Sequence, residues 1–410
     1  MKSDRSGRSR VRVVVIATII VAVAGYLVLV VAAPALGPAK YSVFAAFWSA
    51  LYLAVGSIFG IQQEITRQVS ASAGGQEVPK RPRVLVSGLL VAGALAVLVV
   101  ASAPVWAARA FGSDAGLFVV LIALAILLYA GQSVMIGALA GDAKWGSYSA
   151  VLIAEAVSRL GFILVAATFV AKVEPFAVAS VAAMATWLVF LSAKTPREAL
   201  LARGADHLTS SLGRLSHSIG GAASSAVLVT GFPLLLALTG HTADRAQMGV
   251  VVLVVTLTRA PVLLPMNAFL GMLIGRLSQN RAGRIWEQVK GPAILIVSAS
   301  AAVAIGGYFL GDPLLRFVFG STYQSDGWFI AGAALVAGMV GLLSLSGAVA
   351  IAAELHSVYL LGWLLAALTS TALLALPISL QPRVLLALAI GPLIGMAVHA
   401  VGIRLRRGRT

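Results

Sequence analysis

Arg259 is a charged residue in the middle of an apolar stretch, residues 248–274, that contains no acid. A charge at such a position is costly, and it indicates function when it faces the interior of a helix bundle. The partner of Arg259 must therefore come from another helix, from water in a cavity or from an anionic substrate. Thr256 and Asn267 lie on the same side of the expected helix. We expect these three residues to line a substrate cavity.

Glu155 and Arg159 form a second charged feature inside an apolar stretch, residues 147–170. They are four residues apart, so in a helix their side chains can form an ion pair. Such a pair is self-neutralising and can be purely structural. It can equally be a coupling pair that changes its protonation during function. The sequence leaves both readings open.

The segment 56–67, GSIFGIQQEITR, ends an apolar stretch with an abrupt change to polar residues. At 100° per residue its small and polar side chains fall within about 40° of one line. These residues are Ser49, Tyr52, Gly56, Gly60, Gln63 and Arg67. The opposite side carries residues that we expect to face lipid, namely Leu51, Ala54, Ile58, Ile61 and Ile65. The polar side indicates either close helix packing through its glycines or the wall of a cavity open to the cytoplasm, with Arg67 at the cytoplasmic mouth.

These residues need a membrane-embedded helical scaffold to position them. The chain of 410 residues is 60% hydrophobic and only 11% charged, whereas soluble domains are about 25% charged. Apolar stretches of about 20 residues, enough to cross a bilayer as a helix, recur throughout. We expect an all-α polytopic membrane protein with about twelve spans. They are roughly 12–33, 41–63, 84–106, 116–140, 147–170, 174–193, 218–239, 248–274, 291–310, 328–352, 357–378 and 384–403.

The distribution of basic residues predicts the orientation of these spans. Placing the N-terminus inside puts 22 of the 30 Lys and Arg residues on the cytoplasmic side, in agreement with the positive-inside rule. The net charge of +16 therefore reflects topology, and we expect no nucleic-acid partner. We expect a protein of the bacterial cytoplasmic membrane with both termini in the cytoplasm.

The chain shows signs of two six-helix halves. The turns 111–116 and 319–327 both contain a Phe-Gly-Ser motif, at an offset close to half the chain. Transporters are often built from such repeats, with the substrate site between them. We expect an N-terminal lobe over residues 1–194, a cytoplasmic linker over 195–217 and a C-terminal lobe over 218–410.

Several catalytic chemistries lack residues to carry them. The sequence has no cysteine, its five histidines do not have metal-ligand spacing, and it contains no G-x-x-x-x-G-K-[ST] motif for ATP. The first outer loop, PALGPAKYS, has no acid of the kind expected in a glycosyltransferase that uses a lipid-linked donor. We expect a protein that is not an enzyme and that has no metal and no cofactor.

Three segments carry a family resemblance. They are LGPAKYSVFAAFWSALYL with GIQQEITR, then GALAGDAKWGSYSAVLIAEAVSRLGF, then GDPLLRFVFGSTYQ. In this order they resemble polysaccharide flippases of the Wzx type, in the multidrug/oligosaccharidyl-lipid/polysaccharide (MOP) exporter superfamily. The resemblance spans most of the chain.

The resemblance implies a two-lobed, MATE-like transporter that moves a polyprenyl-pyrophosphate-linked oligosaccharide from the inner to the outer leaflet by alternating access. Arg259 and Arg67 would then contact pyrophosphate, because a guanidinium binds phosphate oxygens in a bidentate way. Gln62, Gln63 and Tyr52 would meet sugar hydroxyls or water. The partners would be the lipid-linked glycan, the bilayer and glycosyltransferases or a polymerase of the same pathway.

Two other functions fit the sequence less well. Drug and cation exporters of this superfamily tend to carry an acid in helix one or seven, but spans 12–33 and 218–239 have none. A MATE-like multidrug exporter is therefore the alternative within transport, and no coupling ion can be identified. A non-transporting scaffold for glycosyltransferases is the alternative outside transport, in which case Arg259 would be structural.

Overall fold

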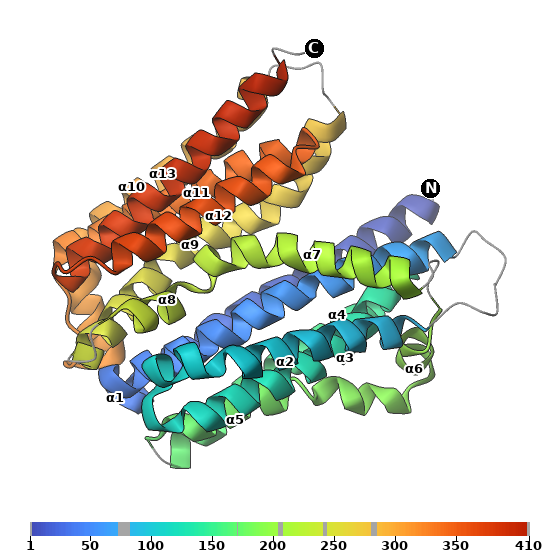
Figure 1. The fold of residues 1–410 in the computed structure, drawn as a ribbon, viewed down its shortest axis with the longest axis horizontal. Coiled ribbons are helices and arrows are strands. Elements are labelled where there is room, and N and C mark those ends of the chain that lie inside the picture. The colour runs from blue at the N-terminus through green and yellow to red at the C-terminus, as the bar shows by residue number, and fades with distance from the viewer. Residues whose placement is uncertain are drawn as a thin grey trace. The chain divides into compact units, whose positions relative to one another are not determined.

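The computed structural model describes residues 2–72, 83–169, 171–203, 208–240, 244–279 and 285–407, and this part of the chain is nearly all helical (Figure 1). The predicted all-α fold is confirmed. The helices are α1 (Lys2–Ser72), α2 (Val84–Phe111), α3 (Ala115–Gly141), α4 (Trp145–Phe169), α5 (Val173–Ala183), α6 (Lys194–Leu200), α7 (Leu208–Val229), α8 (Phe232–Thr239), α9 (Arg245–Gln279), α10 (Ile285–Phe319), α11 (Gly327–Ala352), α12 (His356–Leu374) and α13 (Leu380–Arg407).

Within the described residues, nine helical segments are long and apolar enough to cross a membrane. Two of them, 12–71 and 84–141, are 60 and 58 residues long, and each contains two of the spans predicted from the sequence. The first is interrupted at Gly37, whose φ of 70° and ψ of 164° are not helical. Such a φ is readily adopted only by glycine, and Gly37 lies in the turn expected between the first two spans.

Two of the predicted spans are broken helices. Span 174–193 consists of α5 followed by a 3₁₀ helix, Thr186–Ser192. Span 218–239 comprises the end of α7 and the whole of α8, with a break at Thr230 and Gly231. Pro233 stands in the first turn of α8, where its missing N–H costs nothing. A broken helix leaves backbone carbonyls that need hydrogen-bond partners. The carbonyls at the break between α7 and α8 form part of the candidate site described below.

The chain divides into two compact units, which are described separately. The first comprises Met1–Leu36 and Ala46–Ala226, and the second comprises Gly37–Ala45 and Val227–Thr410.

In the first unit, α1 packs tightly against α3 through glycines. A Cβ atom at Gly137 would lie 2.8 Å from the backbone oxygen of Gln62, and one at Gly141 would lie 2.7 Å from the side chain of Val69. Close approach of this kind is typical of membrane helices that meet at small residues.

This packing corrects one prediction from the sequence. The face of α1 that we expected to contact lipid is buried inside the unit, with Ile58, Ile61 and Ile65 all at 0% exposure. Leu51 and Ala54 are buried as well. The physical reason is that lipid tails and a helix-bundle interior are equally apolar, so an isoleucine stripe is compatible with either environment.

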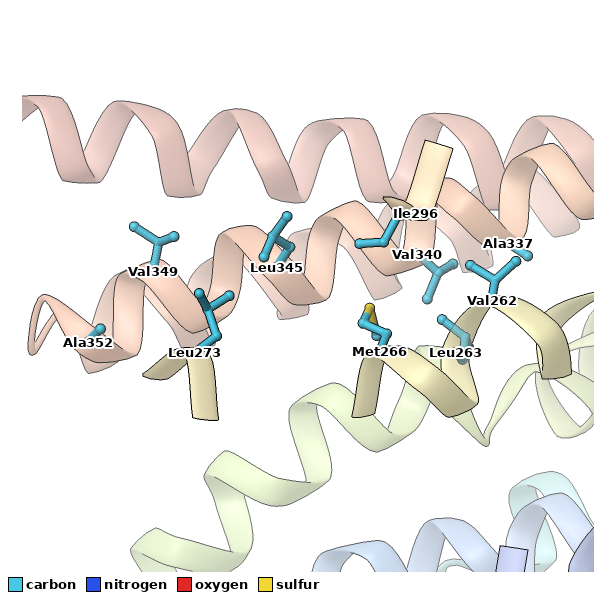
Figure 2. Packing of buried hydrophobic residues seen from close by; sticks show 10 residues of the cluster. All are labelled: Val262, Leu263, Met266, Leu273, Ile296, Ala337, Val340, Leu345, Val349 and Ala352. Carbon is cyan, nitrogen blue, oxygen red and sulfur yellow. The ribbon is translucent and has the colours of Figure 1, made fainter. Parts of the chain in front are cut away.

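In the second unit, an apolar cluster joins α9, α10 and α11 (Figure 2). Figure 2 shows Met266 of α9, Ile296 of α10 and Val340 of α11 directed into the same space. Two segments that carry the family resemblance also meet in this unit. The ring of Tyr41 contacts the ring of Tyr323 edge-on, with the centroids 6.3 Å apart. Both rings are fully buried.

Candidate functional site

Glu155 and Arg159 of α4 form the ion pair that their spacing allows, between Oε1 of the glutamate and Nη2 of the arginine. Both residues are buried, at 3% and 5% exposure. Two charges inside a membrane protein persist only when they are paired. The pair is therefore a fixed feature of the interior of the first unit.

Two aromatic rings of α1 cover the guanidinium of Arg159. Its central carbon lies 5.3 Å from the ring centroid of Tyr52 and 5.8 Å from that of Trp48. The two rings are themselves neighbours, with centroids 4.7 Å apart. Arginine over an aromatic face gains about 0.5–2 kcal/mol, with the larger values at desolvated sites. We call Trp48, Tyr52, Glu155 and Arg159 the arginine cage.

The sequence singled out Tyr52 but missed Trp48. The two are four residues apart on α1, which is the spacing of neighbours on one helix face. An aromatic pair at this spacing opposite a buried arginine could have been noticed, but only the tertiary structure shows that α4 lies against it.

Several buried polar atoms in the first unit, two of them in the arginine cage, make no hydrogen bond among the described residues. Within the described part of the chain, the Tyr52 hydroxyl and Arg159 Nε are buried and have no hydrogen-bond partner. The same holds for both amide atoms of Gln132 on α3, a residue with 0% exposure. Buried polar groups are nearly always hydrogen-bonded, so these atoms are candidates for contacts with polar groups of a ligand.

A second polar cluster lies at the end of α1 that we expect to face the cytoplasm. Glu64 is buried and accepts hydrogen bonds from Arg67 Nη2 at 2.7 Å and from Gln68 Nε2 at 3.0 Å. Arg214 of α7 places its Nε 3.3 Å from the same carboxylate. The arginine side chains are 47% and 45% exposed, whereas that of Glu64 is 6% exposed. We call Glu64, Arg67, Gln68 and Arg214 the arginine pair site.

The two predicted glutamines occupy different environments. Gln62 is buried and donates from Nε2 to the Tyr148 hydroxyl of α4, at a long distance of 3.5 Å. Gln63 is exposed. Gln62 thus belongs to the interior of the first unit, whereas Gln63 lies on its surface.

Arg259 belongs to the second unit and contacts the broken helix. It is 6% exposed, and Nη1 donates to the carbonyl oxygens of Leu228 at 3.4 Å and Val229 at 3.3 Å. Its guanidinium carbon lies 5.2 Å from the ring centroid of Phe232. The sequence left three possible partners for Arg259, namely another helix, water or an anionic substrate. In the structure the partner is another helix, α7. Arg259 caps the carbonyl end of α7, where the backbone has lost its helical partners.

Thr256 and Asn267 were expected to lie beside Arg259, and no contact between their described atoms and Arg259 is seen. The Thr256 hydroxyl donates to the carbonyl of Val252 in its own helix, at 2.7 Å. Asn267 lies in α9, but its side chain is outside the part of the structure that is described. Among the described residues there is no group of three or more His, Cys, Asp or Glu that could hold a metal ion.

The sequence is similar to curated proteins over nearly its full length. It is 39% identical over 399 residues to the uncharacterized protein Rv3630 of Mycobacterium tuberculosis, covering 94% of this chain and 90% of the relative. It is 36% identical over 389 residues to the uncharacterized protein Rv1510 of the same organism, covering 93% and 88%. No model of a known protein family matches the chain.

Solved structures with a similar fold come from one superfamily. An inward-facing multidrug resistance MATE transporter of the MOP superfamily matches with a TM-score of 0.71 at 12% identity, over 94% of both chains. The lipid II flippase MurJ matches with a TM-score of 0.65 at 14% identity, over 94% of this chain and 87% of MurJ. A MOP superfamily transporter from Pyrococcus furiosus matches with a TM-score of 0.64 at 12% identity, over 96% and 95%. The chain belongs to the family of the mycobacterial proteins Rv3630 and Rv1510, and it has the fold of the MOP superfamily transporters.

Proposed function

We propose that this protein is a membrane transporter that flips a polyprenyl-pyrophosphate-linked oligosaccharide from the inner to the outer leaflet by alternating access. The fold is shared with transporters, one of them the lipid II flippase MurJ. The observation that carries the choice of cargo is the arginine pair site, where two half-exposed arginines share one buried carboxylate.

The charges of the arginine pair site suit a phosphate headgroup. Among the described residues of the site, two guanidiniums and one carboxylate sum to a charge of +1, and both arginine side chains reach solvent. Guanidinium groups recognise phosphate oxygens through paired, charge-assisted hydrogen bonds. The arginine side chains are partly exposed, so an incoming pyrophosphate would reach both of them and compete with Glu64 for their hydrogen bonds. This site would receive the headgroup on the cytoplasmic side.

The arginine cage suits the saccharide. Binding sites for small molecules combine aromatic walls with a few precisely placed polar groups. The cage supplies the rings of Trp48 and Tyr52, and its buried Tyr52 hydroxyl has no protein partner among the described residues. Gln62 and the exposed Gln63 would contact sugar hydroxyls or water along α1. Arg259, held at the carbonyl end of α7, would supply the guanidinium of the second unit.

The alternative of a multidrug exporter for organic cations is disfavoured by the state of the buried acids. In the first unit Glu64 is paired with Arg67 and Arg214, and Glu155 is paired with Arg159. A cationic drug would have to displace an arginine from either carboxylate. The scaffold alternative predicts that the arginines are dispensable for lipid-linked sugar translocation, which the experiment below tests.

The test is depletion of the protein in its bacterial host, followed by leaflet-resolved labelling of lipid-linked sugars. We expect the intermediate to accumulate on the inner leaflet. The wild-type gene and the Lys194→Ala variant, which changes an 82% exposed lysine, should restore export. The double variant Arg67→Ala with Arg214→Ala should not. Absence of any accumulated intermediate, or full rescue by the double variant, would rule out this function.

A further inference from the structure

His399 lies at the contact of three helices in the second unit. It belongs to α13, has 0% exposure, and is surrounded by Ser346 of α11 and Tyr359 of α12. The approach is close enough to require glycine, because a Cβ atom at Gly362 would lie 2.2 Å from the imidazole Nε2. An ionisable side chain inside a membrane protein is a functional candidate by default.

Both ring nitrogens of His399 lie within hydrogen-bond distance of an oxygen atom. Nε2 lies 3.3 Å from the carbonyl oxygen of Tyr359, which can only accept. Nδ1 lies 2.8 Å from the Ser346 hydroxyl oxygen. That hydroxyl also lies 2.8 Å from the carbonyl oxygen of Leu343, so its single hydrogen can be donated either to Leu343 or to Nδ1. When the hydroxyl donates to Leu343, both ring nitrogens face acceptors, and only the imidazolium form supplies two N–H donors.

The surroundings oppose this positive charge without excluding it. Helices α11, α12 and α13 contain no Asp or Glu, and burial disfavours the charged form. The titratable and charged side chains on these helices are His356 and Tyr359 on α12 and four arginines of α13. These arginines are Arg383, Arg404, Arg406 and Arg407. The hydrogen bond to the Tyr359 carbonyl favours the charged form, whereas burial favours the neutral one. Histidine is the side chain whose ordinary charge change lies closest to neutral pH.

We infer that His399, Ser346 and the Tyr359 carbonyl form a proton-binding site in the second unit. The loaded site holds an imidazolium that donates from Nδ1 to Ser346 and from Nε2 to the Tyr359 carbonyl. When the proton leaves, one nitrogen keeps a lone pair facing an oxygen. The neutral ring can then keep both contacts only if the Ser346 hydroxyl turns toward Nδ1 and gives up Leu343. Proton release thereby alters the contact of α11, α12 and α13. The role of this proton as the coupling ion rests on the proposed transport function.

The site is tested without any cargo, on the full-length protein in lipid nanodiscs. Nitrogen-15 NMR of labelled histidines, recorded from about pH 5 to about pH 8.5, reports the protonation of each ring nitrogen. His399→Gln identifies the His399 signals. We expect two protonated nitrogens at the acid end and a titration midpoint within this range. A single neutral tautomer over the whole range would overturn the proposal.

Two serines of α11 provide a matched comparison. Ser346→Ala removes an acceptor of the charged form and should lower the midpoint by about one pH unit. Ser344→Ala removes a hydroxyl that bonds only within its own helix, to Val340, and should leave the midpoint unchanged. Equal midpoints in the two variants would contradict the assigned hydrogen bond. These variants also keep the test informative if His399→Gln does not fold.

The proton site and the proposed cargo can fail independently. In proteoliposomes, translocation of the lipid-linked oligosaccharide should respond to a pH gradient in wild type and not in His399→Gln. If His399 titrates but no lipid-linked saccharide moves, the proposed cargo is wrong and the proton site stands. If saccharide moves but His399 never changes its charge, the proton site is wrong and the transport function stands.

Discussion

Arg214 Nε lies 3.3 Å from Glu64 Oε1, and this contact joins α7 to α1 within the first unit. The same carboxylate binds Arg67 on its own helix. One buried acid therefore holds two arginines from distant parts of the sequence at one place. Their combined charge exceeds that of the acid, so the contact organises a cationic surface as well as a packing interaction.

The first prediction concerns the charge of this site. Glu64→Gln removes the carboxylate that competes for both arginines, so inorganic pyrophosphate should bind more tightly. We expect the dissociation constant to fall about tenfold, which corresponds to about 1.4 kcal/mol, when binding to the purified protein is measured by calorimetry. Lys194→Ala should leave the constant unchanged. Weaker binding to Glu64→Gln would mean that the carboxylate organises the site rather than competes with the anion.

The second prediction concerns the ion pair of the arginine cage. Arg159→Ala leaves Glu155 buried without its partner, which should lower the free energy of unfolding by about 3–5 kcal/mol. The double variant Glu155→Gln with Arg159→Gln removes both charges and should recover more than half of that loss. Thermal unfolding in detergent measures both effects. If the single and double variants are equally unstable, the ion pair is not what stabilises the cage.

The third prediction compares two helical glycines of the first unit. Gly137→Ala places a methyl group 2.8 Å from the Gln62 carbonyl oxygen, so we expect a loss of about 1–3 kcal/mol. Gly93→Ala in α2 meets no atom within 4 Å and should gain about 0.5–1 kcal/mol from the reduced flexibility of the unfolded chain. The two variants should therefore shift the melting temperature in opposite directions. Equal shifts would show that α1 and α3 do not approach closely at Gly137.

The fourth prediction separates the two roles of Arg259. Arg259→Lys keeps the charge but loses the planar guanidinium that lies over the Phe232 ring and donates from Nη1 to two carbonyls. We expect a moderate loss of thermal stability and partial translocation of lipid-linked sugars in this variant. Arg259→Met fills similar volume without charge, and translocation should fall to background while the protein still folds. Unaffected translocation in a folded Arg259→Met variant would remove Arg259 from the proposed site.

Hydropathy and local spacing were sufficient to predict the helical membrane fold. In lipid every backbone polar group needs a partner within its own segment, so a long apolar run already implies a helix. The Glu155–Arg159 pair was predictable from spacing, because side chains four residues apart meet on one face of a helix. The turn at Gly37 follows from a glycine that can adopt a positive φ.

Only the tertiary structure decided which faces and which distant residues meet. Ile58, Ile61 and Ile65 are buried against neighbouring helices instead of facing lipid, and no apolar pattern distinguishes these two environments. Trp48 over Arg159, Arg214 beside Glu64, and Ser346 beside His399 each join residues from different helices. Such contacts depend on how the helices pack against one another. The pattern of residues along a single helix does not specify this packing. The sequence by itself thus determined the elements and their charges, and packing alone determined the sites that those charges form.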